Sequence, residues 1–307
     1  MENFDVIILG GGSAGLAAAT ALGRFRRSVA VIDSGQTRNA PAAGVHNLLT
    51  RDGINPLELQ RLGRAEAESY GVRFFDEEAT AVRPGFTVVA AVERTAQRLL
   101  LATGVTDALP DIEGLRERWG RDVIHCPYCH GWEVRDRRIG ILGTHAMVAH
   151  QALLFRELTD SVTVYLDPDA GVPESDLEML AARGIQLVRG TVVSMHTVDD
   201  ALATVTLADG STHALDALAV APRVTARASM LAGVGVATVE HPRGVGTHVP
   251  VDDSGLTSVA GIWAAGNVAD PMAQVVTSAA QGLMAGAAIN GDLVMEDARA
   301  AFTAVAL

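Results

Sequence analysis

The chain has 307 residues and a mass of 32.0 kDa, a length that predicts about two domains. Its formal net charge of −12 and isoelectric point near 5.1 argue against nucleic acid or an anionic membrane as a partner, because both favour a basic surface. No segment approaches the roughly 18 uninterrupted apolar residues of a membrane span. The 31 glycines and 49% hydrophobic residues favour an α/β protein with many tight turns between strands and helices.

The first 35 residues predict a strand, a glycine turn, a helix and a second strand. "DVIILG" is a continuous apolar run, as expected for a parallel strand that is buried on both faces. "GGGSAGLAAATALGRF" predicts the helix, and "SVAVIDSG" predicts the second strand. No basic region precedes the first apolar run, so it does not resemble a secretory signal, and we expect a cytoplasmic protein.

The turn of this unit carries the pattern G-x-G-x-x-G, which is typical of dinucleotide-binding sites. The first glycine would make the tight turn, the second would let a pyrophosphate approach the backbone, and the third would allow the helix to pack closely on the strand. The helix N-terminus adds amide donors and a favourable dipole. An acidic residue ends the second strand and could accept hydrogen bonds from ribose hydroxyls. The predicted binding residues are Gly10, Gly12, Ser13, Ala14, Gly15 and Asp33.

A second unit of the same type begins near Arg137, with the strand "RRIGILG", the helix "THAMVAHQALLFREL" and the strand "SVTVYLD". Two such units predict two related nucleotide-binding-type domains, one of them inserted into the other. The turn of the second unit has His145 at the second glycine position and Val148 where a small residue belongs, and a histidine side chain would obstruct a pyrophosphate. Asp167 and Asp169 would repel a 2′-phosphate. We therefore expect this domain to keep the fold without a working NADPH site.

The only two cysteines, Cys126 and Cys129, form a Cys-x-x-Cys motif inside "HCPYCHGWE". This spacing serves zinc sites, haem attachment and redox disulfides. Two cysteines cannot make a four-thiolate zinc site, and haem attachment normally occurs outside the cytoplasm. A redox-active disulfide is therefore the favoured interpretation. Pro127 suits a first helical turn, whose amides and dipole would favour a thiolate on the first cysteine.

Four segments occur in the order found in low-molecular-weight thioredoxin reductases: "GGGSAG", "LLLATG" (99–104), the Cys-x-x-Cys motif and "GIWAAGNV" (261–268). This resemblance covers essentially the whole chain. "HCPYCHGWE" together with "HNLLTRDG" (46–53) resembles more closely the flavin-dependent dithiol oxidases, which form disulfides in small natural products such as gliotoxin, holomycin and romidepsin. The resemblance implies an α/β fold with two Rossmann-like, three-layer domains. A discontinuous FAD-binding domain would comprise 1–113 and 225–307, and the inserted pyridine-nucleotide-type domain would comprise 114–224.

The resemblance also implies roles for single residues. Cys126 would exchange with substrate and Cys129 would face the flavin. His130 replaces the acidic residue of ordinary thioredoxin reductases and would act as an acid and base, since imidazole titrates near neutral pH; alternatively, it only hydrogen-bonds a helix end. Further FAD-binding positions would be Asn47, Gly104, Gly266, Asn267 and Gln274. Asn267 stands where most relatives have aspartate, although its amide oxygen can also accept a hydrogen bond.

The sequence therefore predicts an FAD-dependent dithiol oxidase that forms an intramolecular disulfide in a small-molecule dithiol. Electrons would pass from substrate through Cys126 and Cys129 to FAD and then to O₂, with release of H₂O₂. The nearest alternative is a thioredoxin-disulfide reductase that uses NADPH or another electron donor such as ferredoxin. A flavin-binding redox sensor is the non-enzymatic alternative. The resemblance further implies a homodimer.

Overall fold

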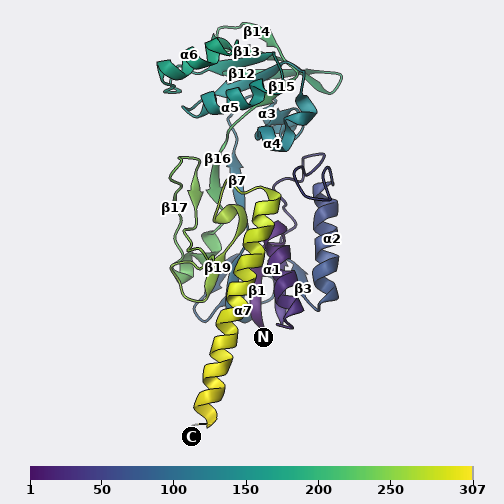
Figure 1. Ribbon diagram of the computed structural model, residues 1–307, viewed down its shortest axis with the longest axis vertical. Coiled ribbons are helices and arrows are strands. Elements are labelled where there is room, and N and C mark those ends of the chain that lie inside the picture. The colour runs from purple at the N-terminus through teal and green to yellow at the C-terminus, as the bar shows by residue number, and fades with distance from the viewer. Residues whose placement is uncertain (306–307) are drawn as a thin grey trace. The chain divides into compact units, whose positions relative to one another are not determined.

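The computed structural model describes residues 1–305, and the chain divides into two compact units (Figure 1). Unit 1 consists of Met1–Ala40, Asn55–Asp107 and the chain from Val224 onward, whereas unit 2 consists of Pro41–Ile54 and Ala108–Arg223. The loop Pro41–Ile54 thus groups with unit 2, although the predicted boundaries assign it to the FAD-binding domain.

Unit 1 contains a seven-stranded sheet and two separate two-stranded sheets. Its strands, including two at its border with unit 2, are β1 (Glu2–Leu9), β2 (Val29–Asp33), β3 (Arg73–Asp76), β4 (Ala81–Arg83), β5 (Thr87–Val89), β6 (Arg94–Leu101), β7 (Val105–Ala108), β16 (Arg223–Ala226), β17 (Val239–Glu240), β18 (Thr247–His248) and β19 (Ile262–Ala264). Its helices are α1 (Ser13–Arg24), α2 (Pro56–Ser69), α7 (Val275–Val305) and the 3₁₀ helices η2 (Ser229–Val234) and η3 (Gly266–Val268).

The central strands of unit 1 are parallel, in the order β3-β2-β1-β6, with β19 parallel to β6 and the β4–β5 hairpin antiparallel to it. Leu9 at the end of β1 lies opposite Ile32 and Leu101, and Leu101 lies opposite Ala264. The strands therefore end together at one edge, where ligands bind in open α/β sheets. This arrangement confirms the predicted α/β fold with Rossmann-like parallel strands.

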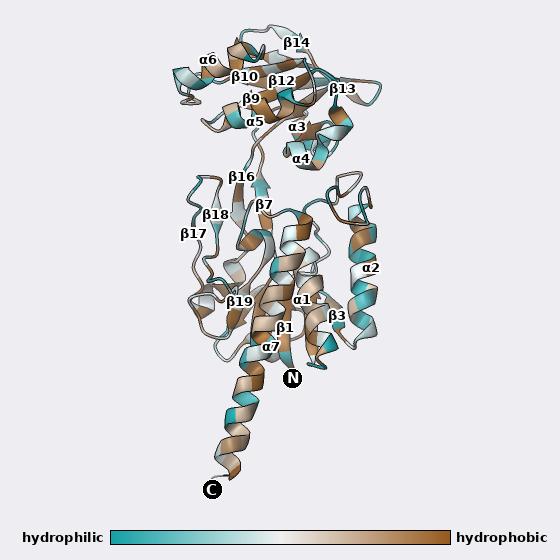
Figure 2. Ribbon diagram, in the orientation of Figure 1, coloured by the Kyte–Doolittle hydropathy of each residue, from teal (hydrophilic) through white to brown (hydrophobic). Residues whose placement is uncertain are grey.

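Helices α1 and α7 cover one face of this sheet through small residues. An added Cβ on Gly282 of α7 would lie 2.0 Å from the Ala14 carbonyl oxygen, so only glycine allows the two helices to approach this closely. Ile8 of the sheet and Ile289 of α7 belong to the same buried apolar cluster. The opposite face is covered by the β4–β5 hairpin and η2, with Leu231 fully buried. Figure 2 shows the hydropathy of these elements along the ribbon, and the start of α1 at Ser13 closely follows the end of β1 at Leu9.

Unit 2 contains a parallel sheet in the order β11-β10-β9-β15-β8 and an antiparallel sheet in the order β12-β13-β14. Its strands are β8 (Val123–Ile124), β9 (Ile139–Gly143), β10 (Val162–Leu166), β11 (Gln186–Arg189), β12 (Val192–Val198), β13 (Ala201–Leu207), β14 (Thr212–Ala214) and β15 (Ala217–Ala219). Its helices are α3 (Leu115–Arg118), α4 (Pro127–His130), η1 (Trp132–Val134), α5 (Val148–Arg156) and α6 (Glu174–Ala182).

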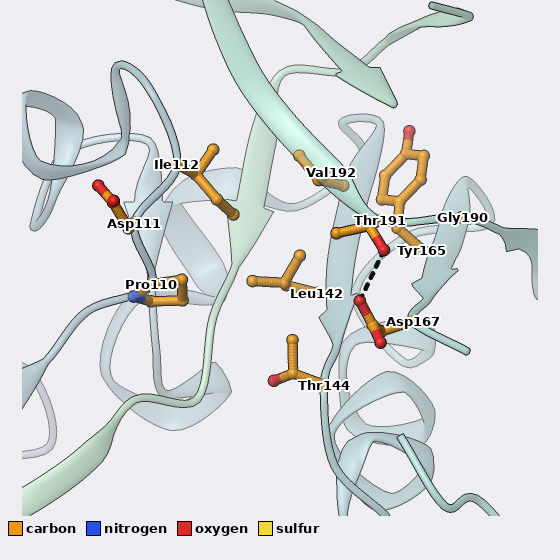
Figure 3. Close-up of a pocket in the computed structure, with 10 residues that line it drawn as sticks. All are labelled: Pro110, Asp111, Ile112, Leu142, Thr144, Tyr165, Asp167, Gly190, Thr191 and Val192. Carbon is orange, nitrogen blue, oxygen red and sulfur yellow. Dashed lines mark hydrogen bonds between the residues drawn. The ribbon is translucent and has the colours of Figure 1, made fainter. Parts of the chain in front are cut away.

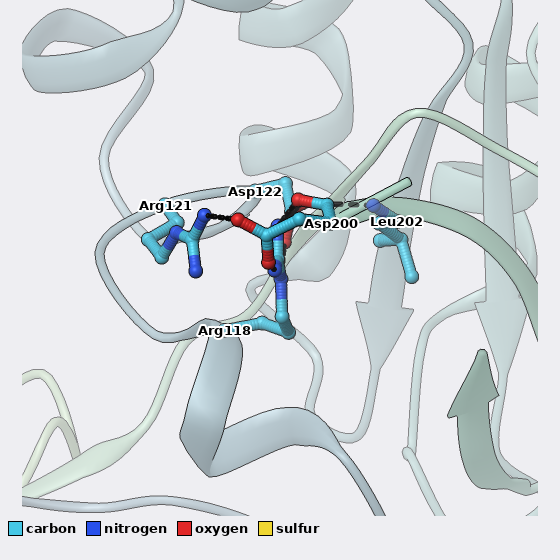
Figure 4. A network of polar contacts seen from close by, with 5 residues as sticks. All are labelled: Arg118, Arg121, Asp122, Asp200 and Leu202. Atoms are coloured by element: carbon cyan, nitrogen blue, oxygen red, sulfur yellow. Dashed lines mark hydrogen bonds and ion pairs between the residues drawn. The ribbon is translucent and has the colours of Figure 1, made fainter. Parts of the chain in front are cut away.

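A charged network ties the antiparallel sheet of unit 2 to α3 (Figure 4). The β12–β13 turn places Asp199 and Asp200 at φ values of 49° and 58°, a conformation that aspartate tolerates better than most residues. Arg118 donates to carboxylates of Asp122 and Asp200, and Arg121 also pairs with Asp200. These carboxylates raise the pKa of Arg118, chiefly through the Asp122 hydrogen bonds. The two arginines thereby neutralise negative charge of the carboxylates at and near this turn.

Candidate functional site

Glycines 10, 12 and 15 of the turn between β1 and α1 and of the first turn of α1 each serve a different physical purpose. Gly10 has φ +104°, and a Cβ there would lie 2.5 Å from the Ala102 carbonyl oxygen. A Cβ on Gly15 would lie 1.9 Å from the Gly10 carbonyl oxygen. Gly12 has no such constraint, because its Cβ would meet no atom within 4 Å among the described residues. The fold therefore requires Gly10 and Gly15, whereas Gly12 leaves open space at the start of α1, as a bound pyrophosphate needs.

The acidic end of β2 is fixed by a residue that the sequence reasoning did not identify. Gln60 of α2 donates from Nε2 to Asp33 Oδ2 at 3.1 Å and to the Gly11 carbonyl at 3.2 Å. The Thr37 hydroxyl donates to Gln60 Oε1 at 2.7 Å. Asp33 is thus held beside the glycine turn, where it can accept from a ribose hydroxyl. Only the long-range pairing of α2 with this turn reveals Gln60, which has no local sequence signal.

The segment after β19 explains why asparagine replaces aspartate at position 267. Asn267 Nδ2 lies 2.8 Å from the Ala273 carbonyl oxygen and 3.2 and 3.3 Å from those of Asp270 and Pro271. A carboxylate cannot donate to these oxygens, so the amide holds the turn that precedes α7. The oxygen Oδ1 is then the atom of this side chain that can accept from a ligand.

The other predicted cofactor residues of unit 1 lie around the same edge. A Cβ on Gly266, which has φ +76°, would lie 2.9 Å from Ala14 Cβ, so η3 adjoins the start of α1. Ser13 is the first residue of α1. Gly104 has φ +71° in the connection from β6 to β7. Gln274 immediately precedes α7, and its carbonyl accepts from the Ser278 amide at 2.8 Å. The residues of unit 1 therefore fit a dinucleotide at this edge.

The cysteines lie in unit 2 at the start of a single helical turn. Cys126 is the extended residue before α4, and its carbonyl accepts from the amides of Cys129 and His130, both at 3.1 Å. Both cysteines are half-buried. The predicted helix start is present with Pro127 in its first turn. Since α4 is only four residues long, its dipole is small.

The surroundings of His130 favour the neutral form of its imidazole ring. Its Nε2 is buried and has no hydrogen-bond partner within residues 1–305. Burial lowers the pKa of His130 below its ordinary value, with the Glu133 charge raising it and the charges of His46 and His125 lowering it further. Neutral imidazole can accept a proton from an incoming thiol. The orphaned nitrogen therefore favours the acid–base interpretation over a hydrogen bond to the helix end.

The loop 41–54 packs against the cysteine helix within unit 2. Asn47 has φ 59° and donates from Nδ2 to the Tyr128 carbonyl at 2.6 Å. Its backbone amide donates to Asp52 Oδ1 at 2.8 Å. His46 lies between two carboxylates, with Nδ1 3.3 Å from Asp52 and Nε2 3.4 Å from Glu133. The side chain of Asn47, predicted to approach a flavin, is thus engaged with α4.

His125, the residue before the first cysteine, is held by two hydrogen bonds. The His125 ring nitrogen Nδ1 lies 3.0 Å from the Val220 carbonyl oxygen, so this nitrogen carries the proton and donates. Gln151 of α5, which is 9% exposed, donates from Nε2 to the His125 carbonyl at 2.7 Å. His125 therefore orients the chain that enters the motif.

The turn after β9 in unit 2 carries larger side chains at two positions where dinucleotide-binding turns have small residues. His145 occupies the second glycine position, and its Nδ1 accepts from the Met147 amide at 3.2 Å. Val148 is fully buried in the core of unit 2, so a bulky side chain fills the position where dinucleotide-binding turns have a small residue. The turn thus delays the start of α5 to Val148, four residues later than the sequence predicts.

A cavity of about 180 Å³ lies at the carboxyl ends of β9 and β10 (Figure 3). Asp167 Oδ2 accepts from the Thr191 hydroxyl at 2.8 Å, and its Oδ1 accepts from the Asp169 amide at 3.1 Å. The ten lining residues include two carboxylates and no arginine or lysine; they are Pro110, Asp111, Ile112, Leu142, Thr144, Tyr165, Asp167, Gly190, Thr191 and Val192. A 2′-phosphate would meet negative charge here instead of the guanidinium groups that bind it.

Across residues 1–305, no helix has the length and apolar composition needed to cross a bilayer. No group of three His, Cys, Asp or Glu side chains in the same part of the chain is arranged to hold a metal ion.

Two parallel-sheet units, one with a dinucleotide-type turn and the other with a Cys-x-x-Cys motif, define a thioredoxin reductase-like oxidoreductase. Residues 4–282 match the family described as pyridine nucleotide-disulphide oxidoreductase, and the chain belongs to this family. The resemblance to thioredoxin reductases is thereby confirmed.

Individual relatives agree with this assignment. The chain is 32% identical to the thioredoxin reductase sirT of Leptosphaeria maculans, over 94% of this chain and 93% of the relative. The crystal structure of HlmI matches with a TM-score of 0.91 and 42% identity, covering 99% of this chain and 96% of HlmI. An oxidoreductase from Agrobacterium tumefaciens matches with a TM-score of 0.89 and 35% identity, covering 96% and 99% of the two chains.

Proposed function

We propose that this protein is an FAD-dependent dithiol oxidase that converts a small-molecule dithiol into its intramolecular disulfide. The contrast between the two turns carries the proposal. Unit 1 keeps an open glycine at position 12, whereas His145 and the carboxylate of Asp167 stand where unit 2 would bind NADPH. In the absence of that site, we infer that the electrons enter from the substrate thiols. The natural-product class of the substrate rests on the resemblance of "HCPYCHGWE" and "HNLLTRDG" to dithiol oxidases.

The residues of unit 2 supply thiol–disulfide exchange. His130 takes the proton of one substrate thiol at its buried Nε2, and the resulting thiolate attacks the Cys126 sulfur of the enzyme disulfide. The second substrate thiol then displaces Cys126, which releases the cyclic disulfide and leaves both cysteines reduced. The edge of unit 1 would hold FAD, which when bound would supply the electron acceptor for the reduced cysteines, with O₂ as final acceptor and H₂O₂ as product. Asp33 and Asn267 Oδ1 would hold its hydroxyl groups.

Exposed side chains beside the cysteines fit a small apolar substrate. Tyr128 and Trp132 are 63% and 64% exposed, although such large aromatic residues usually lie in a core. Leu49 of the loop 41–54, two residues from the hydrogen bond between Asn47 and Tyr128, is 87% exposed. These side chains are available to a ligand at the motif.

The test uses the purified, oxidised holoprotein without oxygen. Dithiothreitol or NADPH is added separately, flavin absorbance is followed, and H₂O₂ is measured after oxygen is admitted. We expect bleaching by dithiothreitol alone, reversed by oxygen with peroxide formed, and no bleaching by dithiothreitol in Cys129→Ser. His150→Gln, an exposed change on α5, serves as the control that keeps the activity. Rapid bleaching by NADPH would contradict the proposal.

The alternative function is a thioredoxin-disulfide reductase, which the name of the relative from Leptosphaeria maculans favours. It predicts saturable reduction of a thioredoxin at the expense of NADPH or another donor. Failure of thioredoxin to turn over under conditions where dithiothreitol does would exclude it.

We also propose that the enzyme is a homodimer joined through α7. One face of this helix packs on α1, and the other carries an exposed apolar stripe at helical spacing. The stripe consists of Val276, Leu283, Met284, Val294, Met295, Phe302 and Val305. Every residue of 294–305 is exposed, and a helical segment of this length is marginal in water without a packing partner. A second copy would offer the same stripe, as a two-fold interface requires.

Light scattering after size exclusion tests this interface. We expect twice the chain mass of 32.0 kDa for the wild type and a shift towards monomer in Phe302→Glu. Thr303→Glu, on the opposite side of α7, should leave the mass unchanged. A monomeric wild type would contradict the proposal. The cytoplasmic location stays a prediction.

A further inference from the structure

Gln281 is a long polar side chain on the face of α7 that packs on α1 (Figure 1). Ser278, three residues before it, is 8% exposed, and Ala285, four residues after it, is 1% exposed. The adjacent Gly282 lies against Ala14 of α1. Residues three and four positions apart share one face of a helix. Gln281 is itself half-buried there, and a polar group in such a place costs free energy unless it has hydrogen-bond partners.

Both ends of the Gln281 amide find partners in the segment that follows β19. The backbone amide of Gly266 donates to Gln281 Oε1 at 3.1 Å, and Gln281 Nε2 donates to Asp270 Oδ2 at 3.0 Å. A backbone N–H can only donate and a carboxylate can only accept, so these partners fix which end of the side chain faces which group. A glutamate could accept from Gly266, but it would repel Asp270.

Segment 266–270 is a turn that closes on itself. The amides of Ala269 and Asp270 both donate to the Gly266 carbonyl at 2.9 Å. Gln281 therefore holds the first and the last residue of this turn and links both to α7. Asn267 lies inside the turn, and its Nδ2 donates to carbonyl oxygens at the end of the turn and just beyond it. The direction of Asn267 Oδ1 therefore depends on where the turn is held.

We propose that Gln281 is a positioning residue for the flavin cofactor, an inference that rests on the FAD binding proposed above. By holding the turn, it sets the direction of Asn267 Oδ1, the atom of that side chain that can accept a hydrogen bond from the cofactor. Hydrogen bonds weaken steeply as their angle worsens, so a small movement of the turn loses this contact. Gln281 acts through Asn267 and makes no cofactor contact of its own.

Two ionisable side chains reach the same segment from the chain between β17 and β19. His248 Nδ1 lies 3.1 Å from the Ala269 carbonyl oxygen, and Arg243 Nη1 lies 3.7 Å from Met272 Sδ. Both stay unchanged in the variants below. Comparing each variant with the wild type at the same pH therefore removes their contribution.

The first experiment measures FAD binding to the flavin-free, full-length protein by calorimetry at pH 6 and pH 8.5. In Gln281→Glu the new carboxyl still accepts from Gly266 but faces the carboxylate of Asp270. Two adjacent carboxyls share a proton below the raised pKa of the pair and repel each other as the pH rises through it. We expect FAD to bind about tenfold more weakly than to the wild type at pH 8.5, with a smaller difference at pH 6. An unchanged affinity at pH 8.5 would overturn the proposal.

The second experiment exchanges donor and acceptor in the double variant Gln281→Glu/Asp270→Asn. The new amide at position 270 can donate to the new carboxylate, and its oxygen can still accept from the Met272 amide as Asp270 Oδ1 does. We expect the affinity for FAD at pH 8.5 to return to within about threefold of the wild type. Failure to regain affinity would overturn the role of this pair.

The matched control is Gln97→Glu in β6. Gln97 also donates from Nε2 to a carboxylate at 3.0 Å, that of Asp5 in β1. This pair lies towards the starts of the two strands, whereas the cofactor edge lies at their ends. The same chemical change should therefore leave the affinity for FAD unchanged. An equal loss in Gln97→Glu would show that the effect has no link to the turn and would overturn the proposal.

Binding of ADP separates positioning from a general loosening of unit 1. ADP carries the ribose and pyrophosphate that Asp33 and the turn at Gly12 would hold, and it lacks the rest of FAD. We expect Gln281→Glu to bind ADP as the wild type does while FAD is weakened. Equal weakening of both ligands would overturn the positioning role. A wild type that binds no FAD would contradict the proposed function and this inference with it, whereas wild-type FAD affinity in Gln281→Glu contradicts only the inference.

Discussion

Units 1 and 2 each run a buried parallel strand into a turn and a helix, yet unit 1 has Gly12 at the position where unit 2 has His145. In unit 1 the protein itself requires Gly10 and Gly15, and Gly12 is left with open space beside it. In unit 2 the side chain of His145 caps its own turn, and Val148 is part of the core. The comparison teaches that a glycine which the fold does not require is the better sign of a bound dinucleotide.

The acidic residues of the two units are less informative than the turns. Asp33 and Asp167 occupy equivalent places after the second strand of each unit, and both are held by a neutral side chain. Gln60 holds the first and Thr191 the second. An acid at this position is therefore compatible with either a used or a disused site.

The largest expected effect is that of Gly12→Ala. A methyl group there meets no protein atom, so folding should be unaffected, but it would occupy the approach of the pyrophosphate. We expect FAD affinity to fall about 100-fold, roughly 2.7 kcal/mol. Flavin content after dialysis and thermal unfolding of the flavin-free protein measure the two effects separately. Gly291→Ala, also in open space but on α7, is the matched control. Full flavin retention in Gly12→Ala would show that the open space beside Gly12 is not needed for FAD binding.

The next effect is a loss of folding stability at high pH, which we expect from Tyr165 of unit 2. The ring of this tyrosine packs against Gly140. An added Cβ on Gly140 would lie 2.8 Å from the Tyr165 ring, so this glycine serves packing. Burial raises the pKa of Tyr165 to about 12. The unfolded chain ionises near pH 10 and the native side chain does not, so the stabilisation is complete below pH 10. It is lost as the pH rises towards 12, by up to about 2–3 kcal/mol.

Urea unfolding at pH 8 to 11.5 measures this loss. Tyr165→Phe should flatten the decline, whereas Tyr70→Phe, at a 40% exposed position in unit 1, should leave it as in the wild type. An equal decline in Tyr165→Phe would show that other groups cause it.

The sequence predicts the parallel strands and their turns well because these signals are local. The apolar run before Gly10 becomes β1, and the run before Thr144 becomes β9. The C-terminal helix α7 extends from Val275 to Val305, and beyond its buried part Asp292 and Glu296 bind Arg98.

Contacts between distant segments could not be predicted in this way. His46 and Glu133 are far apart in the sequence and meet only because the loop 41–54 folds onto the cysteine helix. Neither residue carries a motif of its own. The antiparallel strands β12 and β13 were likewise missed, since their turn uses Asp199 and Asp200 instead of the asparagine or glycine that marks such hairpins.

The smallest expected effect is a partial return of nucleotide binding in His145→Gly. This change removes the obstructing side chain, but Val148 remains, and the loss of the His145 contact with the Met147 amide loosens the turn. We expect NADH to bind with a Kd near 1 mM, about −4 kcal/mol. NADPH should bind more weakly still, because Asp167 can accept from a ribose hydroxyl and repels a 2′-phosphate. Calorimetry with both nucleotides measures the difference, with His150→Ala as control. Tight NADPH binding by the wild type would show that the turn does not prevent nucleotide binding. NADPH would then be the electron source of the enzyme, as in a disulfide reductase.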